Sequence, residues 1–374
     1  MTRQSAILAT ATFTVAVLAA TAVAGCAPSM MIPRPMPGEC PSHFTAAVAW
    51  SSPTSRASRI QFFDDGQLVG ETQIPVQGLS TSDQTPLHNA GTVSLFSTGD
   101  AAHDESNIVT IELATCAVTL TRLRDDIPFN IALAKDGYIS ISNLNQVSYL
   151  REYRMGSDNV MQKADLDHEL VTAAAVFGER VYAKSESWVS GKSSIIVFRS
   201  DGLTRVGQVD LPSVAPGSGG NSIAIASNKL IVPVPLKDGG EAADSRLIVV
   251  ELGSSTAHAL DLKRPFPFDV RAIGDTLYVA HTFLNPGFQP MSEYRHVSVL
   301  DMRDESVVGH DLQAGVRRID VNSETFAALG EDDDGTPVLH TYTLPSFDLS
   351  AKVRLTPPSG VPDAYAATVF VVQS

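Results

Sequence analysis

The sequence contains few of the residues and motifs from which most catalytic and metal sites are built. It has only three cysteines and two tryptophans in 374 residues. No CxxC or CxxCH motif occurs, which argues against a cysteine metal site and covalently bound haem. HxxH, HExxH and Gly-x-Ser-x-Gly patterns are also missing, so no zinc-hydrolase helix or serine-nucleophile turn is predicted. Trp50 and Trp188 lie in unrelated contexts, unlike the docking repeats of quinone-cofactor propellers. We therefore expect no cofactor and no metal.

Basic residues are also in deficit. The chain has 27 lysines and arginines against 41 aspartates and glutamates, and its formal net charge is −14. A polyanion attracts proteins with a basic surface, because lysine and arginine side chains replace its counterions. Nucleic acid is therefore not an expected partner.

A long run that is both uncharged and apolar lies at the beginning of the chain. Residues 6–24 follow the single basic residue Arg3 and are rich in alanine, valine, threonine and leucine. The run ends in Val23-Ala24-Gly25-Cys26, which resembles the lipobox of bacterial lipoproteins. An uncleaved spanning helix is the alternative, but the small residues without flanking basic residues do not favour a stop-transfer segment.

The lipobox resemblance implies a division of the chain into three parts. Residues 1–25 would be a signal peptide, 26–41 a lipidated cysteine and proline-rich tether, and 42–374 the folded domain. Cys26 would carry diacylglycerol and a further acyl chain such as palmitate, and two or more chains give a stable anchor. The expected location is the extracytoplasmic side of the cell membrane, with the lipid anchor as the membrane contact.

Two cysteines remain besides Cys26. In an oxidising compartment, Cys40 and Cys116 are expected to form a disulfide. Two free thiols and a metal pair are the alternatives. Closing this loop would contribute about 4 kcal/mol to stability in the chain-entropy model.

An internal repeat indicates the fold. Short segments with a polar turn recur at 134–140, 177–183, 226–232, 273–279 and 321–327, and each has the pattern of a β-hairpin. A second set of seven alternating segments starts at residues 59, 107, 146, 194, 246, 296 and 338. Four strands per 40–50 residues is typical of a β-propeller blade. We predict an all-β, seven-bladed β-propeller, with six or eight blades as alternatives because 76–100 is irregular.

The chain ends suggest how the ring closes. The last repeat finishes near Leu355, yet residues 363–372 have the pattern of another innermost strand, and the first repeat lacks one. A C-terminal strand that completes the first blade removes the open sheet edges. We predict such a strand closure.

One blade resembles a known family. Residues 274–281 and 296–309 are similar to the YVTN repeat of bacterial surface and periplasmic propellers, with an insertion at 282–295. The residues that carry the resemblance are Tyr278, Val279, Val297, Ser298, Val299 and Asp301. It implies a fold and a compartment rather than an activity, because propellers have many functions.

Several polar residues fall on the predicted innermost strands. Aligning these strands on their turns places Asp269 with Arg318 in one layer, and Arg271 with Asp320 in the next. These pairs are expected to hold two blades together, because buried charges require partners. Binding of a small polar ligand at the channel mouth is the alternative. Three further channel candidates complete that set: His88, Asn130 and Tyr365.

The segment 330–336, GEDDDGT, has the acidic character of a calcium loop. The calcium pattern fails because residue 330 is glycine and no glutamate follows at the required distance. We expect a solvated acidic turn in which Asp332 and Asp333 face water.

The connections between the second and third strands of blades four to seven are long. The 282–295 connection concentrates the apolar residues Phe283, Phe288, Met291 and Tyr294. Exposed apolar side chains mark interface cores, so we predict this loop as the centre of a partner-binding surface with the acidic turn on its rim. A loop packed over its own blade is the alternative.

These features favour a non-catalytic binding or scaffold module for an envelope protein or glycan. The alternative is a hydrolase or oxidoreductase, similar to lactonases or amine dehydrogenases, with its site at the channel mouth.

Overall fold

The computed structural model describes most of the chain after residue 40. The described residues are 41–52, 54–79, 85–99, 106–124, 128–212, 214, 222–237, 242–254, 256–282, 294–361 and 363–372. All regular elements in these ranges are β-strands. Within them, no helix has the length and apolar character needed to cross a membrane.

Tight turns separate the strands. Four two-residue turns have positive φ at both positions: Asp65-Gly66, Ala90-Gly91, Asn145-Gln146 and Ser227-Asn228. Positive φ at both central residues defines the type I′ turn, whose twist matches that of a β-hairpin. The five polar turns of the repeat each join two paired antiparallel strands, as the sequence predicts.

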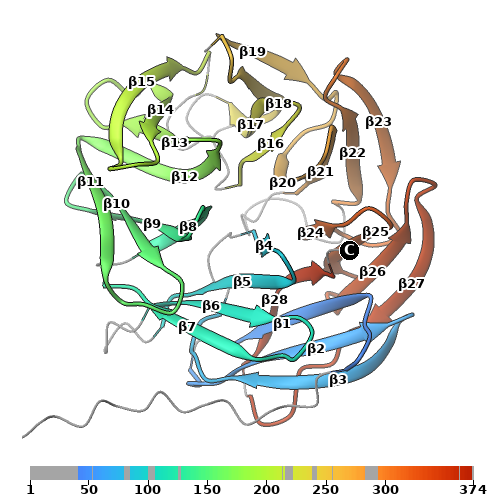
Figure 1. Cartoon of the computed structure of the whole chain (residues 1–374). Coiled ribbons are helices and arrows are strands. Elements are labelled where there is room, and N and C mark those ends of the chain that lie inside the picture. Colours follow the sequence, from blue (N-terminus) through green and yellow to red (C-terminus); the bar gives the residue numbers. More distant parts are fainter. Residues whose placement is uncertain are drawn as a thin grey trace, which may run out of the picture. The chain divides into compact units, whose positions relative to one another are not determined.

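The strands form seven four-stranded antiparallel sheets, which we call blades 1 to 7 (Figure 1). Blades 1 to 3 consist, from the innermost strand outwards, of β28 Tyr365–Val371, β1 Ala46–Ser51, β2 Ser58–Asp64 and β3 Gln67–Ile74; β4 Leu87–Asn89, β5 Thr92–Ser97, β6 Asn107–Glu112 and β7 Val118–Arg122; and β8 Pro128–Ala134, β9 Gly137–Leu144, β10 Val147–Arg154 and β11 Val160–Asp167. This order repeats around the ring.

The remaining four blades follow the same order without interruption. They consist of β12 Glu169–Phe177, β13 Arg180–Ser187, β14 Ser193–Arg199 and β15 Thr204–Asp210; β16 Ala224–Ala226, β17 Lys229–Lys237, β18 Ala242–Glu251 and β19 Thr256–Asp261; β20 Pro267–Ile273, β21 Thr276–His281, β22 His296–Asp301 and β23 Ser306–Asp311; and β24 Arg318–Val321, β25 Thr325–Glu331, β26 Pro337–Thr343 and β27 Asp348–Arg354. The chain is thus a seven-bladed β-propeller, as predicted.

The two ends of the described chain complete one blade together. Strand β28 is the innermost strand of blade 1 and pairs with β1 from Ala46 opposite Val371 to Ser51 opposite Tyr365. The predicted strand closure is therefore confirmed.

The core lies between adjacent blades rather than inside one sheet. Alternate side chains of a strand point to opposite faces of its sheet, and both faces of the middle strands are covered by neighbouring blades. All six residues of β1 are consequently buried, whereas β27 alternates between exposed and half-buried positions. This packing fixes each blade against the next.

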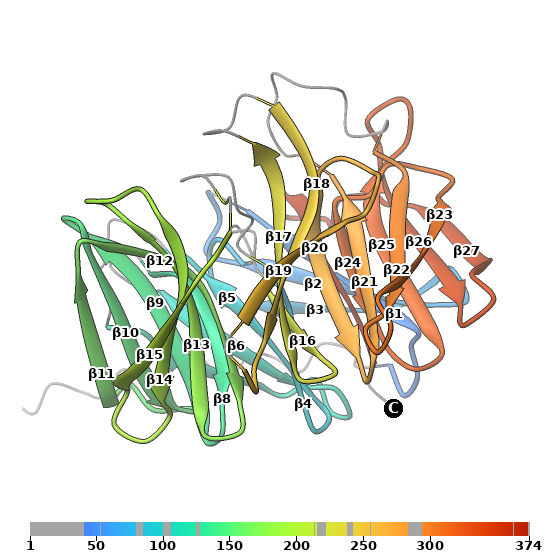
Figure 2. The ribbon, with the colours of Figure 1, turned by 90° about the horizontal axis from the view of Figure 1, so that it is seen from above.

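The ring has two different faces. The connections from second to third strand, and from each outer strand to the next blade, emerge on one side, which we call the loop face. The remaining hairpin turns and both ends of the described chain lie on the other, the turn face; Figure 2 shows the C-terminus at its lower edge. Pro41, Gly91, Ala114 and Glu324 line one cavity there, which brings together the chain entry and turns of blades 2 and 7.

Candidate functional site

A short turn on the loop face presents two large apolar side chains to solvent. Trp188 and Val189 lie between β13 and β14 of blade 4 and are 54% and 77% exposed. The amide of Trp188 donates to the carbonyl of His168 at 2.9 Å, and that of Gly191 donates to the carbonyl of Ser187 at 2.8 Å. The turn is held by its backbone, so the two side chains are exposed from an ordered support.

The predicted hydrophobic centre at 282–295 is described only at its ends. Phe283, Phe288 and Met291 lie outside the described residues. Tyr294 was expected to face water, but it is only 7% exposed and its ring meets that of Phe266 edge-on at 5.6 Å. It packs with Leu236 of blade 5 in a small cluster. For Tyr294 the alternative of a loop that packs on the propeller holds, because burying an aromatic ring against apolar neighbours is more favourable than exposing it to water.

The acidic turn between β25 and β26 is compensated by basic residues. The Lys352 ammonium lies 2.8 Å from Asp332, Arg295 pairs with Asp333, and Arg354 pairs with Asp334. Asp333 remains 83% exposed at its side chain, whereas Asp332 is 19% exposed. The prediction of an acidic turn in solvent therefore holds for Asp333 and is wrong for Asp332, which Lys352 largely covers.

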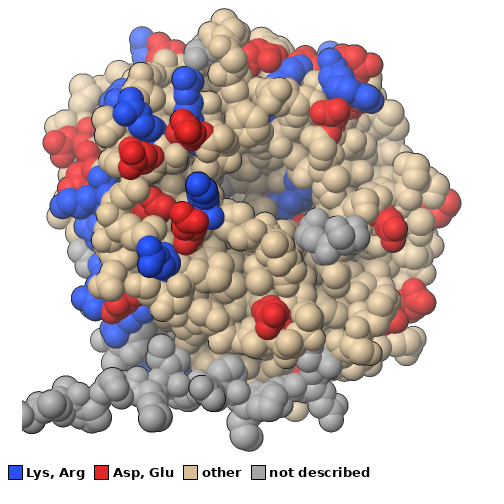
Figure 3. All heavy atoms as spheres, in the orientation of Figure 1, with Lys and Arg blue, Asp and Glu red and all other residues tan. Residues whose placement is uncertain are grey.

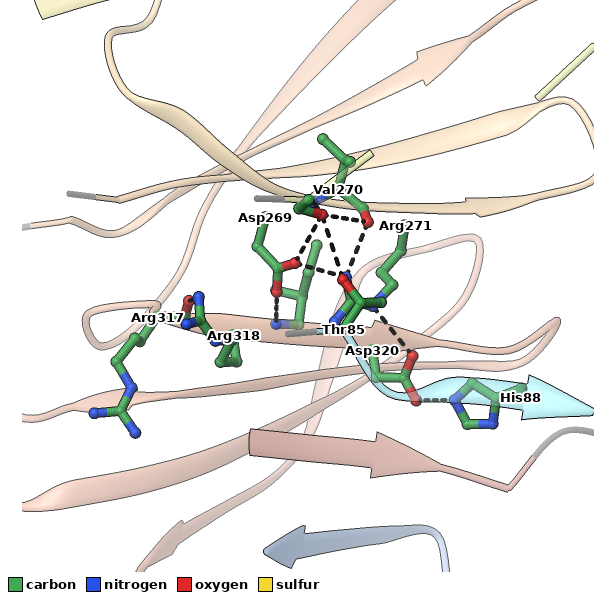
Figure 4. A network of polar contacts seen from close by, with 10 residues as sticks. Thr85, His88, Asp269, Val270, Arg271, Arg317, Arg318 and Asp320 are labelled. Carbon is green, nitrogen blue, oxygen red and sulfur yellow. Dashed lines mark hydrogen bonds and ion pairs between the residues drawn. The ribbon is translucent and has the colours of Figure 1, made fainter. Parts of the chain in front are cut away.

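A buried polar network lies at the centre of the ring, where Figure 3 shows the surface hollowed. The Arg271 guanidinium lies 2.6 Å from Asp269 of its own strand β20 and 3.4 Å from Asp320 of β24. His88 Nε2 lies 2.7 Å from the other oxygen of Asp320 (Figure 4). The predicted Arg271–Asp320 contact between blades 6 and 7 is therefore present.

The carboxylate of Asp320 joins four blades. Besides Arg271 of blade 6 and His88 of blade 2, it accepts a hydrogen bond from the amide of Val371 in blade 1 at 2.8 Å. Asp320 is 1% exposed and itself belongs to blade 7. These contacts support a structural role, because a buried carboxylate requires donors and opposite charge.

The other predicted channel pair has a different arrangement. Asp269 pairs with Arg271, and its second oxygen accepts from the amide of Ile319 at 2.9 Å. Arg318 instead lies over the ring of Phe268 at 5.6 Å. The predicted Asp269–Arg318 pair is therefore wrong.

The two remaining channel candidates lie apart from this network. The Asn130 side chain donates to the carbonyl of Thr172 in the next blade at 2.7 Å, and Tyr365 begins β28 with 36% exposure. Four of the seven candidates therefore form one connected group, Asp269, Arg271, Asp320 and His88, and the other three do not belong to it.

The cysteine predictions fall mainly outside the described residues, which include neither Cys26 nor Cys40. Cys116 is 8% exposed and packs in the same apolar cluster as Phe44. Pro41, which follows Cys40, lines the same cavity as Leu113 and Ala114. The Cys40–Cys116 pair stays a prediction, and this proximity agrees with it.

One group in the described chain has the spacing of metal ligands. Atoms of Glu251, His258 and Glu305 lie within 4.8 Å of one another. The Lys229 ammonium is 2.7 Å from Glu305 and 3.6 Å from Glu251. These two carboxylates hold the pKa of Lys229 above its usual value despite the opposing effect of burial. The protein's own cation therefore already offsets one of the two carboxylate charges of this group.

Sequence reasoning missed several buried charged side chains, among them Lys184 and Glu152. Lys184 on β13 is fully buried, with its ammonium 3.7 Å from Glu186, and burial lowers the pKa of the lysine while Glu186 opposes that shift. Glu152 on β10 is 8% exposed. The signal was strand alternation, since Glu152 follows the fully buried Leu150 by two residues and so faces the same side.

The comparisons with known proteins identify the fold class. No protein-family model matches the chain, and no curated protein matches its sequence. Among solved structures, the chain is similar to a Synechocystis apocarotenoid oxygenase, with 11% identity, a TM-score of 0.53, and coverage of 91% of this chain and 94% of that one. It is also similar to apo AztD from Citrobacter koseri, with 11% identity, a TM-score of 0.52, and coverage of 88% of this chain and 98% of that one.

A third similar structure is the dihydro-heme d1 dehydrogenase NirN, with 14% identity, a TM-score of 0.50, and coverage of 90% of this chain and 79% of that one. At such identities the likeness shows the propeller fold alone, because this fold has many unrelated functions. The segments that resemble YVTN repeats form β21, β22 and the first part of β23 in blade 6, and the family relation stays a resemblance.

Proposed function

We propose that this chain is a lipid-anchored, extracytoplasmic β-propeller that binds a protein or glycan of the cell envelope without catalysing a reaction. The observation that carries the proposal is the backbone-held turn that exposes Trp188 and Val189 on the loop face. Tryptophan is enriched among the residues that dominate binding energy at protein interfaces. Pro41, the first described residue, lines a cavity on the opposite, turn face.

The channel gives less support to an enzyme. Asp269, Arg271 and Asp320 are at most 6% exposed and contact one another. Catalysis there would require these groups to exchange mutual contacts for contacts with a substrate. We place the binding surface on the loop face instead. In this proposal it extends from blade 4 to the 283–293 connection and Asp333.

The anchor has a direct test. Replacing Cys26 by serine removes the thiol that takes the lipid, so we expect the precursor to accumulate unprocessed by the lipoprotein peptidase. Metabolic labelling with palmitate and a gel shift would measure this, with Cys116→Ser as a control that keeps the label. Normal maturation and lipid labelling of the Cys26→Ser variant would contradict the anchor.

The binding surface is tested by removing both exposed side chains. We expect the double variant Trp188→Ser, Val189→Ser to lose at least about tenfold in partner affinity, because truncating an interface centre costs about 2 kcal/mol or more. A photo-crosslinker at the exposed position 190 of the same turn, in the full chain in membranes, would first identify the partner, and titration of that purified partner would measure the loss.

A matched control is available on the outer strand of blade 6. Val307 and Val308 are adjacent, 38% and 57% exposed, and lie away from the loop face. Serine at both positions should leave the partner affinity unchanged. Equal affinity of the two double variants would place the working surface elsewhere.

A further inference from the structure

A cavity on the turn face lies between blades 3 and 4. It has a volume of about 370 Å³ and is formed by the turns β8–β9, β12–β13 and β14–β15, with β10 behind them. Acidic and basic side chains gather on this face over blades 3 and 4, at the left of Figure 3. A volume of this order is sufficient for a small organic ligand.

The inner wall of the cavity carries one carboxyl group in an apolar row. Glu152 pairs with Ile139 of β9 and Gln162 of β11 and continues the side of β10 that buries Leu150. It is 8% exposed, and none of its described neighbours makes a hydrogen bond or ion pair with its side chain. An unpartnered carboxylate in such a place costs free energy, which a bound cation would recover.

The surroundings favour a positive charge. Asp136, Glu179 and Asp201 line the cavity with Glu152, against two basic residues, Lys135 and Arg199. Four acidic and two basic groups leave two negative charges when all are ionised. Burial raises the pKa of Glu152, and the negative charges of Asp136 and Asp201 raise it further. A cation beside Glu152 would oppose all three effects.

The spacing of the ligands distinguishes an organic cation from a metal ion. A metal needs several oxygen or nitrogen atoms converging on one point. Among the histidine, cysteine, aspartate and glutamate side chains of the part of the chain that the structure describes, only Glu251, His258 and Glu305 bring three ligand atoms within 4.8 Å of one another. The cavity instead combines separated carboxyl groups with the apolar side chains of Ile139, Val176 and Val181, which suits a charged group on a hydrocarbon stem.

We propose that this cavity binds an ammonium or guanidinium group on an aliphatic chain, with the positive charge at Glu152 and the stem along the apolar wall. The cation is supplied either by a free organic amine or by a lysine or arginine side chain of a peptide. This site lies on the face opposite Trp188 and does not depend on the function proposed above.

The test uses the full-length protein in detergent and isothermal titration with named probes. These are n-butylammonium, blocked pentapeptides with one central lysine or arginine, and the same pentapeptide with norleucine. We expect saturable binding of the cationic probes and at least tenfold weaker binding of the norleucine peptide. If the cationic peptides bind at least tenfold more tightly than n-butylammonium, the site is assigned to a side chain of a partner. If they bind equally tightly, the site is assigned to a free amine.

Two matched variants locate the charge. Glu152→Gln should weaken the cationic probes at least tenfold, whereas Glu179→Gln, at an exposed position of the rim, should weaken them less than threefold. The melting temperature of Glu152→Gln should not fall, because the variant removes an unpaired carboxyl group. No saturable binding by the wild-type protein, or equal binding by wild type and Glu152→Gln, would overturn the proposal.

Discussion

Replacing Asp320 by alanine is expected to lower the free energy of unfolding by about 3–5 kcal/mol, because Arg271 loses one of the two carboxylates it contacts and two further buried groups lose their acceptor. The Arg271 guanidinium and His88 would both lose this carboxylate, and the amide of Val371 would lose its acceptor. The four blades that meet at this residue include blade 1, where the two chain ends pair. Urea unfolding followed by tryptophan fluorescence would measure the change.

Two further variants separate the contributions at Asp320. Asp320→Asn keeps an acceptor for Val371 and should recover part of the loss, so that the remaining deficit reports the charge. Asp333→Ala removes an ion pair whose carboxylate is 83% exposed and should cost about 0–1 kcal/mol. An Asp320→Ala loss no larger than that of Asp333→Ala would show that the channel network contributes little to stability.

The propeller could be predicted because its signals are local and repeated. Each hairpin needs a short polar turn between alternating strands, and this pattern recurs along the chain. The strand closure also followed from counting, since one innermost strand was missing at the beginning and one remained at the end. Neither inference required knowledge of a particular side-chain contact.

The channel contacts could be predicted only in part. Counting residues from the turns placed Arg271 and Asp320 in one layer, and the structure confirms their contact. The same counting cannot show which way a long side chain turns. Arg271 reaches back to Asp269 on its own strand. Strand β20 also has a bulge between Pro267 and Asp269, and Arg318 lies over the ring of the bulge residue Phe268.

Tyr294 and Glu152 show a second limit, because their environments come from distant segments. Tyr294 is buried by Phe266, which precedes β20, and by Leu236 near the end of β17. The carboxyl group of Glu152 is exceptional only because three turns from two blades enclose it. A single strand pattern indicates burial at such positions but not which partners the neighbouring blades supply.

Two buried histidines should make the protein less stable at mildly acidic pH. His281 is 3% exposed, its Nδ1 lies 2.9 Å from the carbonyl of Pro265, and its Nε2 lies 2.8 Å from the hydroxyl of Ser298. Burial, with a smaller effect from His296, lowers the pKa of His281 to about 4. Burial, with a smaller effect of Lys352, lowers the pKa of His340 to about 4 as well.

In the unfolded chain a histidine titrates near pH 6.5, so between about pH 6.5 and 4 the unfolded state binds protons that the native state does not. The contribution of each buried neutral histidine to the free energy of unfolding is therefore fully present above about pH 6.5 and is lost as the pH decreases towards 4. The loss is about 2 kcal/mol per histidine between pH 7.5 and 5. Urea unfolding across this range would measure the loss, and His281→Gln or His340→Gln should each remove about half of it. The control His43→Gln, at a side chain that is 77% exposed, should keep the full pH dependence. If stability stayed constant from pH 7.5 to 5 in the wild-type protein, both histidines would have to take up protons in the native state as readily as in the unfolded chain.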